Sequence, residues 1–301
     1  MIAQVRPLRP EYAAASLRHL WGVVLSGAEQ PRGLPPTRRH YTGATNLRRR
    51  LSETGPAHLQ HPLERATRFI PTARLVTVVT REAMIAAPDD LVLLPGVHRC
   101  VQPSWRGTAP EVFLGALSVL QHDPHAIVAA FPADHLVQHG PQLMQYVVRA
   151  AGAAAIRPEL PMIVGAYPGS LDPEYSWIEP GEAIDGLEAF AVRAVRRFVA
   201  RPSPAERAGA LLGTLAVVMS ARTLVALGRR HLPDVVECLE PLEDVVGRPE
   251  ATLLCDAVWE SMPRASVCRD LLAHVEPLGV VSMPDAMTGE WVRPVTQALA
   301  S

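Results

Sequence analysis

The stretch Ala126 to His135, AIVAAFPADH, decides the fold class. It begins with an uninterrupted apolar run that stops at Pro132, which is typical of a β-strand buried on both faces. Asp134 follows directly, and in sheets of parallel strands ligands bind in the crevice beyond the carboxyl ends of the strands. The stretch therefore predicts an α/β protein whose functional residues follow its strands.

Runs of the same kind recur on both sides of this stretch and alternate with segments of helical periodicity. Strands are predicted at residues 20–25, 75–80, 98–102, 126–131, 161–167 and 278–283, and helices at residues 58–69, 109–120, 143–154 and 205–231. Residues 187–201, rich in Val and Arg, are predicted to form a small antiparallel excursion. The alternation favours a doubly wound, mostly parallel, Rossmann-like sheet with helices on both faces. We expect residues 1–19 to be a polar lead-in and residues 20–301 to form one domain.

The composition limits the kinds of partner that the protein can bind. The net charge is −1, and all 29 basic residues are arginine, because the chain has no lysine. So small a charge gives no global attraction to nucleic acid or to an anionic membrane, and no apolar run reaches the length of a membrane span. An anionic small molecule would be held by arginine, histidine, backbone N–H groups or a metal ion. A coding bias toward arginine would by itself explain the missing lysine.

The cysteines give no sign of a disulfide framework or a metal site. Cys100, Cys238, Cys255 and Cys268 form no CxxC pair and lie beside no histidine at metal-ligand spacing. Such thiols are typical of a reducing compartment, and charged residues interrupt any apolar leader before residue 20. We therefore expect a cytoplasmic protein, and both homo- and hetero-oligomers stay open.

Four segments beside predicted strands carry residues suited to binding phosphates, bases and sugars. They are LSGAEQPR at 25–32, QPSWRGTAP at 102–110, FPADH at 131–135 and DPEYSWIEPG at 172–181. Together they resemble the motifs LxGGxGxR, QPxNxGTAP, FPxDH and ETGYGWIExG of the sugar-phosphate nucleotidyltransferase family, in particular its mannose-1-phosphate guanylyltransferases. The resemblance implies that residues 20–301 are a nucleotidyltransferase-like domain.

For the nucleotide, the resemblance points to the first two segments. A loop after a strand can wrap phosphates with backbone N–H groups. The nucleotide-binding residues that it implies are Gly27, Glu29, Gln102, Gly107 and Thr108. Arg32 would clamp the triphosphate as a catalytic residue. The plainer alternative for residues 102–110 is the start of a helix with Pro110 in its first turn.

For the sugar phosphate, the resemblance points to residues later in the chain. Tyr175 and Glu179 match positions that bind the sugar, and Arg201 falls on the family's lysine that contacts the sugar phosphate. Arg201, a catalytic residue in this reading, keeps the charge of a lysine but not its shape. The alternative for this region is an aromatic hairpin without a ligand.

For the metal ion, the resemblance implies Mg²⁺ held by Asp134. Mg²⁺ prefers carboxylate oxygens and keeps several waters. Glu290 aligns with the second metal ligand, and Asp285 is the alternative second ligand. Asp134 could equally cap a following helix.

Several positions depart from the family's motifs. Ala28 and Gln30 stand where the family has glycine, and Pro31 removes a backbone N–H. The family's RPKQ lysine, which stabilises the transition state of phosphoryl transfer, is missing, so Arg48 or a neighbouring arginine would have to supply its charge as a catalytic residue. Ala200 replaces a glutamate.

The resemblance implies attack of a sugar 1-phosphate on GTP, which yields GDP-mannose and pyrophosphate. Two functions fit the altered motifs. One is a guanylyltransferase that binds GTP or GDP-mannose and a sugar 1-phosphate with weak or lost turnover. The other is an inactive pseudo-enzyme that acts as a regulatory or scaffolding subunit through protein contacts. A dehydrogenase is disfavoured, because no GxGxxG pattern follows a predicted strand.

Overall fold

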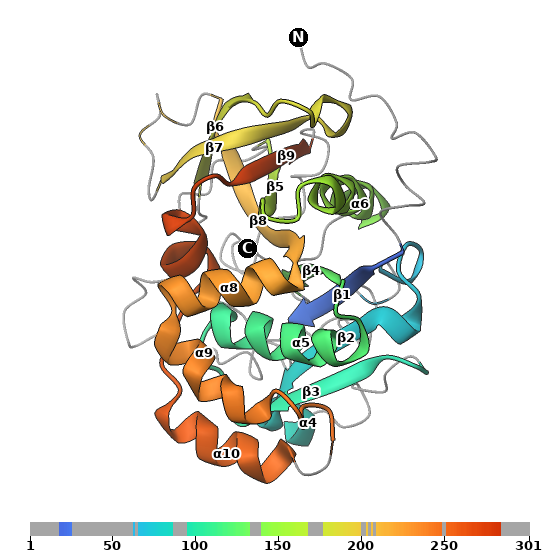
Figure 1. Cartoon of the computed structure of the whole chain (residues 1–301), viewed down its shortest axis with the longest axis vertical. Helices are drawn as coiled ribbons and strands as arrows, with labels where there is room; N and C mark the ends of the chain where they lie inside the picture. The colour runs from blue at the N-terminus through green and yellow to red at the C-terminus, as the bar shows by residue number, and fades with distance from the viewer. Residues whose placement is uncertain are drawn as a thin grey trace, which may run out of the picture.

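A nine-stranded mixed sheet runs through the protein in this computed structural model (Figure 1). The structure describes residues 18–25, 63, 66–86, 95–132, 140–167, 177–199, 203, 206, 209–248 and 251–283. The strands are β1 (Leu20–Leu25), β2 (Leu75–Thr80), β3 (His98–Gln102), β4 (Ile127–Pro132), β5 (Met162–Ala166), β6 (Trp177–Ala183), β7 (Val192–Val199), β8 (Leu211–Ser220) and β9 (Gly279–Met283). Their order in the sheet is β3-β2-β1-β4-β8-β5-β9-β7-β6.

The expected α/β class is confirmed, and the strands expected before residue 170 and after residue 277 form where the sequence predicted them. The sheet, however, is mixed rather than mostly parallel. β7 and β8 run against the remaining strands and make all of its antiparallel pairings. The excursion expected at residues 187–201 is confirmed as β7, which pairs antiparallel with β6 and β9.

The helix expected over residues 205–231 is wrong at Leu211 to Ser220. These residues form the ten-residue strand β8, and Ala221–His231 are helical as expected. The run LLGTLAVVMS has no polar face, so its periodicity fits a buried helix and a buried strand equally well. Its position between β4 and β5 buries it on both sides and selects the strand.

A bulge in β8 redirects this strand. Its register against β5 shifts between Ile163 and Gly165, and Leu215 has a positive φ of 54°. The Thr214 hydroxyl stabilises the irregular backbone, since it donates to the carbonyl of Val164 at 2.6 Å and accepts from the N–H of Ala216 at 3.2 Å. Bulges bend and twist the strand that carries them. The first residues of β8 thereby pair with β6 as well as with β5.

The pairing of β6 with β8 closes part of the sheet into a ring. Trp177 pairs with Leu212 and Ile178 with Leu211. The ring runs through β8, β5, β9, β7 and β6. Gly165 of β5 favours close packing here, because a Cβ at this position would lie 3.0 Å from the side chain of Leu211 and would force a small shift.

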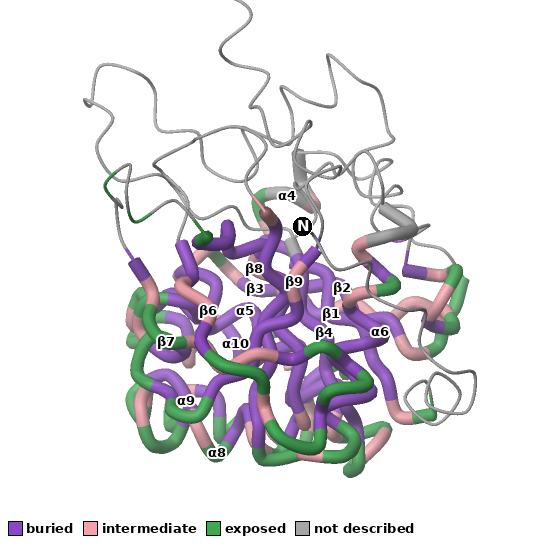
Figure 2. Tube along the Cα trace, turned by 90° about the horizontal axis from the view of Figure 1, so that it is seen from above, coloured by how far each residue is buried: buried purple, intermediate pink, exposed green. Residues whose placement is uncertain are grey.

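Helices cover both faces of the sheet. They are α4 (Arg81–Ala86), α5 (Thr108–His122), α6 (Gly140–Ile156), α8 (Ala221–His231), α9 (Pro233–Leu239) and α10 (Ala251–Ser261). One hydrophobic core lies beneath α5, α8, α9 and α10, and a second lies beneath α6. Figure 2 shows buried residues filling the middle of the molecule and exposed residues lining its lower margin in that view. Most of the helix expected at residues 58–69 lies outside the described residues.

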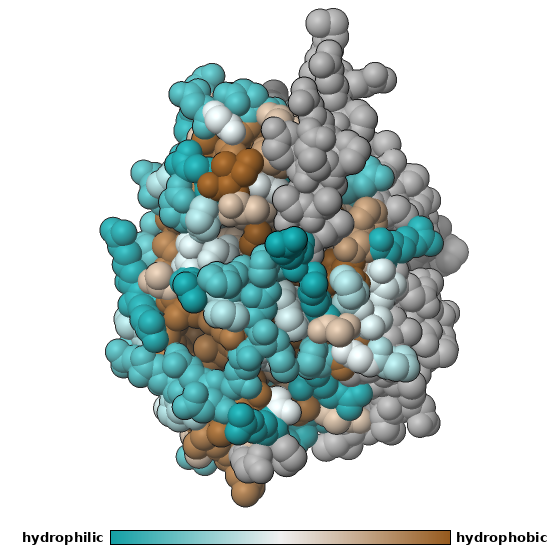
Figure 3. Space-filling view, turned by 45° about the vertical axis from the view of Figure 1, so that its right-hand side comes forward, coloured by the Kyte–Doolittle hydropathy of each residue, from teal (hydrophilic) through white to brown (hydrophobic). Residues whose placement is uncertain are grey.

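The described surface is largely hydrophilic. Figure 3 shows one face on which hydrophobic atoms appear in separate areas among hydrophilic ones. The large hydrophobic side chains exposed within the described residues are Ile156 and Leu253. None of the described helices combines the length and the apolar character that crossing a bilayer requires.

Gly228 tests the packing of α8 on α5 and α9. A Cβ at this position would lie 2.5 Å from the ring of Phe113 and 2.7 Å from the side chain of Val236. A glycine-to-alanine change inside a helix ordinarily stabilises by about 0.5–1 kcal/mol. We expect Gly228→Ala instead to lower the free energy of unfolding by about 1–3 kcal/mol, because it overpacks the core. Urea denaturation of the two proteins measures the difference, and a gain in stability would contradict this packing.

Candidate functional site

The carboxyl ends of the parallel strands meet at one edge of the sheet. Leu25 at the end of β1 pairs with Pro132 at the end of β4, and Ala166 at the end of β5 pairs with Met283 at the end of β9. The motif segments 25–32 and 131–135 leave the sheet at the first of these pairs, and the motif segment 102–110 leaves it at Gln102, the last residue of β3. This edge is therefore the candidate site, as expected for an α/β sheet.

Many candidate residues lie outside the described part of the chain. They are Gly27, Glu29, Arg32, Arg48, Asp134, Tyr175, Arg201 and Glu290. Their roles stay predictions from the sequence. The described candidates are Gln102, Gly107, Thr108 and Glu179, and for these the structure gives partners.

Gly107 is required by a close approach between two backbones. It has a φ of +98°, and a Cβ at this position would overlap the carbonyl oxygen of Ala265. That carbonyl accepts the N–H of Ala109 at 3.0 Å, and the N–H of Ala265 donates to the carbonyl of Arg106 at 3.0 Å. Only glycine combines this φ with this contact at no steric cost. The motif glycine therefore has a structural reason that is independent of any nucleotide.

Thr108, the first residue of α5, also contacts the same distant segment. Its buried hydroxyl oxygen accepts the N–H of Val267 at 2.9 Å. The loop before it is fastened to α10, where the indole of Trp259 donates to the carbonyl of Ser104 at 2.7 Å. The motif at residues 102–110 therefore binds α5 to the chain segment around residue 265.

Gln102 lies at the carboxyl end of β3, level with Thr80 at the end of β2. Its side chain is fully buried, and its Nε2 donates to Oε1 of Glu111, a fully buried carboxylate on α5. Within the described residues, Oε1 of Gln102 has no hydrogen-bond partner. A buried acceptor left without a partner costs about 1–3 kcal/mol. The sequence motif gave no signal for Glu111.

Glu179 on β6 is occupied by two arginines of β7. Its carboxylate accepts from Arg196 Nη1 at 2.9 Å and from Arg197 Nε at 2.8 Å. Arg197 also donates to Glu206 at 3.0 Å, so that it bridges two carboxylates. The hydrogen bond from Arg197, followed by the one from Arg196, lowers the pKa of Glu179 below its ordinary value. The residue expected to bind a sugar is thus already paired with cations, at a partly exposed position.

Glu206 is held by a capping box, in which two residues exchange side-chain to backbone hydrogen bonds. The N–H of Ser203 donates to Glu206 at 2.9 Å, and the N–H of Glu206 donates to the Ser203 hydroxyl at 3.4 Å. The backbone of Ser203, followed by Arg197, lowers the pKa of Glu206 to about 2. The S-x-x-E spacing in the sequence is a signal that could have identified this pair in advance.

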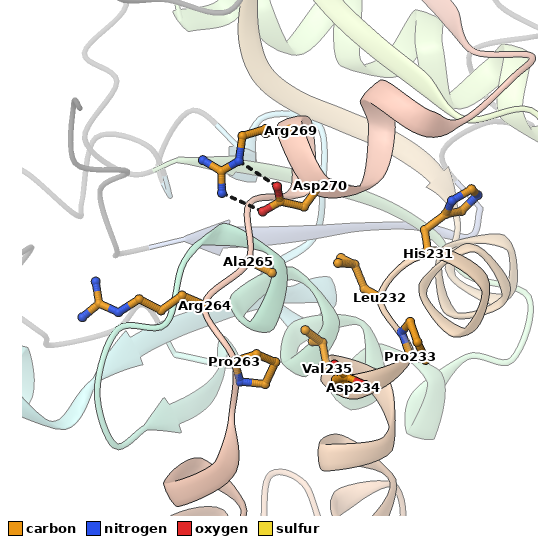
Figure 4. A pocket seen from close by; sticks show the side chains of 10 residues that line it. All are labelled: His231, Leu232, Pro233, Asp234, Val235, Pro263, Arg264, Ala265, Arg269 and Asp270. Carbon is orange, nitrogen blue, oxygen red and sulfur yellow. Dashed lines mark hydrogen bonds and ion pairs between the residues drawn. The ribbon is translucent and has the colours of Figure 1, made fainter. Parts of the chain in front are cut away.

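A cavity of about 350 Å³ lies beside the segment that contacts Gly107. It is lined by His231, Leu232, Pro233, Asp234, Val235, Pro263, Arg264, Ala265, Arg269 and Asp270. In Figure 4 apolar side chains surround its middle, Arg269 and Asp270 face one another, and Arg264 points away. Arg264 lies instead over the ring of Trp105, 5.9 Å from its centroid. The cavity holds none of the residues that the motifs singled out.

The metal prediction rests on Asp134 and Glu290, which lie outside the described residues. Within the part that is described, no group of three or more His, Cys, Asp or Glu side chains could hold a metal ion. The Mg²⁺ site therefore stays a prediction from the resemblance.

The resemblance noted in the motifs is supported by a known sequence. Mannose-1-phosphate guanylyltransferase of Escherichia coli is 26% identical over 147 residues, which are 46% of this chain and 30% of that protein. The match thus spans less than a third of the length of the curated relative. No protein-family model matches the chain.

Two solved structures share the fold. The first, described as a mannose-1-phosphate geranyltransferase from Thermus thermophilus, has a TM-score of 0.69 and 23% identity, and covers 88% of this chain and 74% of that chain. The second, described as mannose-6-phosphate isomerase from Helicobacter pylori, has a TM-score of 0.60 and 14% identity over 88% and 97% of the two chains. These likenesses show that the chain shares the α/β fold of these two proteins, and a fold alone fixes no activity.

The effect of the contact between Gly107 and Ala265 can be measured by comparison with Gly186, a second glycine with a positive φ. Gly186 has a φ of +79°, and a Cβ there would meet nothing within 4 Å. We expect Gly186→Ala to lower the free energy of unfolding by about 1–2 kcal/mol through backbone strain alone. Gly107→Ala should lose about 1–3 kcal/mol more, because it also overpacks against Ala265. Equal losses in urea denaturation would show that the contact with Ala265 has no effect on stability.

The two arginines beside Glu179 make a matched pair for a pH experiment. Because Arg197 contributes most to the low pKa of Glu179, Arg197→Ala should raise this pKa more than Arg196→Ala does. Arg197→Ala should also raise the pKa of Glu206, which Arg196 does not contact in any described hydrogen bond. Carbon-13 NMR of the glutamate carboxyls, from about pH 6 to about pH 1, measures both pKa values.

The sign of the pH effect follows from the lowered pKa values. Both carboxylates contribute stability that is fully present above the unfolded pKa of 4.5 and is lost as the pH falls through the folded value, about 2 for Glu206. The Arg197→Ala protein should lose less stability than the unaltered protein on acidification over this range. An equal loss in both proteins would contradict the role of Arg197.

Proposed function

Given a chain that resembles sugar-phosphate nucleotidyltransferases in sequence and shares their fold, we propose that it binds a guanine nucleotide and a sugar phosphate at the carboxyl edge of its sheet. The observation that carries the proposal is that the strands followed by the motifs end at this one edge, where Leu25 pairs with Pro132 and Ala166 with Met283. Ligands of α/β sheets bind in this position. The ligand would be GTP or GDP-mannose together with a sugar 1-phosphate.

In this proposal arginine side chains hold the phosphates, since the chain has no lysine. Arg32 clamps the triphosphate, Arg48 or a neighbour supplies the charge of the missing lysine, and Arg201 holds the sugar phosphate. Asp134 and Glu290 would hold Mg²⁺, which neutralises phosphate charge when it is bound. Tyr175 and Glu179 would contact the sugar, while Gly27 and Glu29 lie in the phosphate loop.

Turnover in such a site would be weak or lost. Phosphoryl transfer depends on donors that are already oriented before the reaction. Ala28, Gln30 and Pro31 alter the loop whose N–H groups should provide them. Glu179 is already paired with Arg196 and Arg197, so a sugar hydroxyl has to compete with two guanidinium groups for it.

A second candidate function is that of an inactive subunit that regulates or scaffolds an active partner. The observation that favours it is that the motif at residues 102–110 makes contacts that stabilise the fold. Gly107, Thr108 and Ala109 all contact the segment 265–267, so selection for folding alone would keep these residues. A retained motif is therefore weaker support for catalysis here than in the sequence alone.

The rate of pyrophosphate release distinguishes both proposed functions from that of an ordinary, active guanylyltransferase. With GTP, mannose 1-phosphate and Mg²⁺, we expect the purified protein to release pyrophosphate far more slowly than the roughly 10 s⁻¹ of an ordinary enzyme. Titration calorimetry should still detect binding of GTP or GDP-mannose, with UDP-glucose as the competing ligand. An ordinary metal-dependent rate would show that the altered loop is competent, and absence of all nucleotide binding would overturn the proposed function.

A further inference from the structure

The amide of Gln102 is held in one orientation by a residue outside the recognised motif. Gln102 and Glu111 are both fully buried, and Nε2 of Gln102 donates to Oε1 of Glu111. A glutamine amide has a donating end and an accepting end, whereas an ionised carboxylate only accepts, so with Glu111 ionised the pair has one arrangement. The donating end is therefore directed at α5, and the accepting end is directed away from it.

The position of Glu111 is itself fixed. Just before it on α5, Thr108 accepts the N–H of Val267, and Ala109 donates to the carbonyl of Ala265. These contacts hold the first turn of α5 against a segment more than a hundred residues away in the sequence. The carboxylate that orients Gln102 is thus anchored by backbone contacts.

Oε1 of Gln102 is left as a buried acceptor with no partner among the described residues, at the carboxyl edge of the sheet. Buried polar atoms in folded proteins nearly always have a partner, so an atom of this kind marks a place for a donor. If a bound water donates to this atom, changes at Glu111 should not affect which nucleotide binds. If a nucleotide base donates to it, they should.

We propose that Glu111 is a positioning residue that fixes Gln102 as an acceptor for an N–H group on the base edge of guanine. This inference rests on the proposed function, because it assumes that a nucleotide binds at this edge. Guanine presents two adjacent donors, N1–H and the 2-amino group, whereas adenine presents an acceptor at N1. An acceptor that cannot rotate favours the first base and opposes the second. Oε1 has almost no exposed surface in this structure, so a base can reach it only by displacing a neighbouring group.

The test compares the dissociation constants of GTP and ATP for the whole chain by titration calorimetry. The unaltered protein should prefer GTP by roughly tenfold or more, the value of one hydrogen bond. In Glu111→Ala the amide of Gln102 is free to turn and offer its N–H₂ group to N1 of adenine. The preference should therefore fall by roughly tenfold, toward equal binding.

Ser118→Ala is the matched control. Ser118 is a buried residue of the same helix that hydrogen-bonds to Cys100 of the same strand as Gln102. Its loss weakens the same helix-to-strand contact without touching the amide, so the preference for GTP should stay unchanged. The double variant Gln102→Glu with Glu111→Gln exchanges the two groups and keeps an oxygen at position 102, so it should restore the preference. It also serves if Glu111→Ala fails to fold.

The outcomes separate this inference from the function on which it rests. An unaltered protein that prefers GTP, with a preference unchanged in Glu111→Ala, overturns the role of Glu111 and leaves the proposed function standing. A preference lost equally in Ser118→Ala shows a general structural effect and also overturns it. An unaltered protein that binds neither nucleotide overturns both.

Discussion

The contact between the start of α5 and the segment 265–267 joins parts of the chain that lie far apart in the sequence. It consists of a glycine without a side chain, Gly107, and a carbonyl, that of Ala265, which occupies the space a side chain would take. Hydrogen bonds from Ala109 and to Thr108 close the contact. Through it, one chain segment joins the end of β3, the start of the central helix and the helices that follow β8. Any larger residue at Gly107 would push these elements apart.

This contact changes how the sequence motif is understood. The string from Gln102 to Pro110 resembles a nucleotide-binding motif, yet each of its described contacts stabilises the fold. A motif residue can serve both purposes, because a backbone held rigidly for folding is also held rigidly for a ligand. Gln102 illustrates this: one end of its amide is used by Glu111, and the other end has no partner within the described residues.

Two arginines of β7 form the ion pairs around Glu179, the residue predicted to bind the sugar. Arg197 bridges Glu179 and Glu206, and Arg196 adds a second hydrogen bond to Glu179. Exposed pairs of this kind contribute little stability individually, whereas a planar guanidinium that serves two carboxylates fixes their geometry. A lysine could not form the same fork. The absence of lysine in the chain therefore shapes the site through geometry as well as charge.

Local sequence was enough to set the class of the fold and the positions of most strands. Apolar runs such as Leu20–Leu25 and Ile127–Pro132 are local signals, since burial on both faces demands apolar residues at every position. Only the tertiary structure decides that Leu211–Ser220 form a strand, because a buried strand and a buried helix accommodate an apolar run equally well. It was also needed for the ring closed by β6 and β8 and for the partners of Gln102 and Thr108. Val267 lies 159 residues from Thr108, and local sequence carries no record of which distant backbone group a side chain will meet.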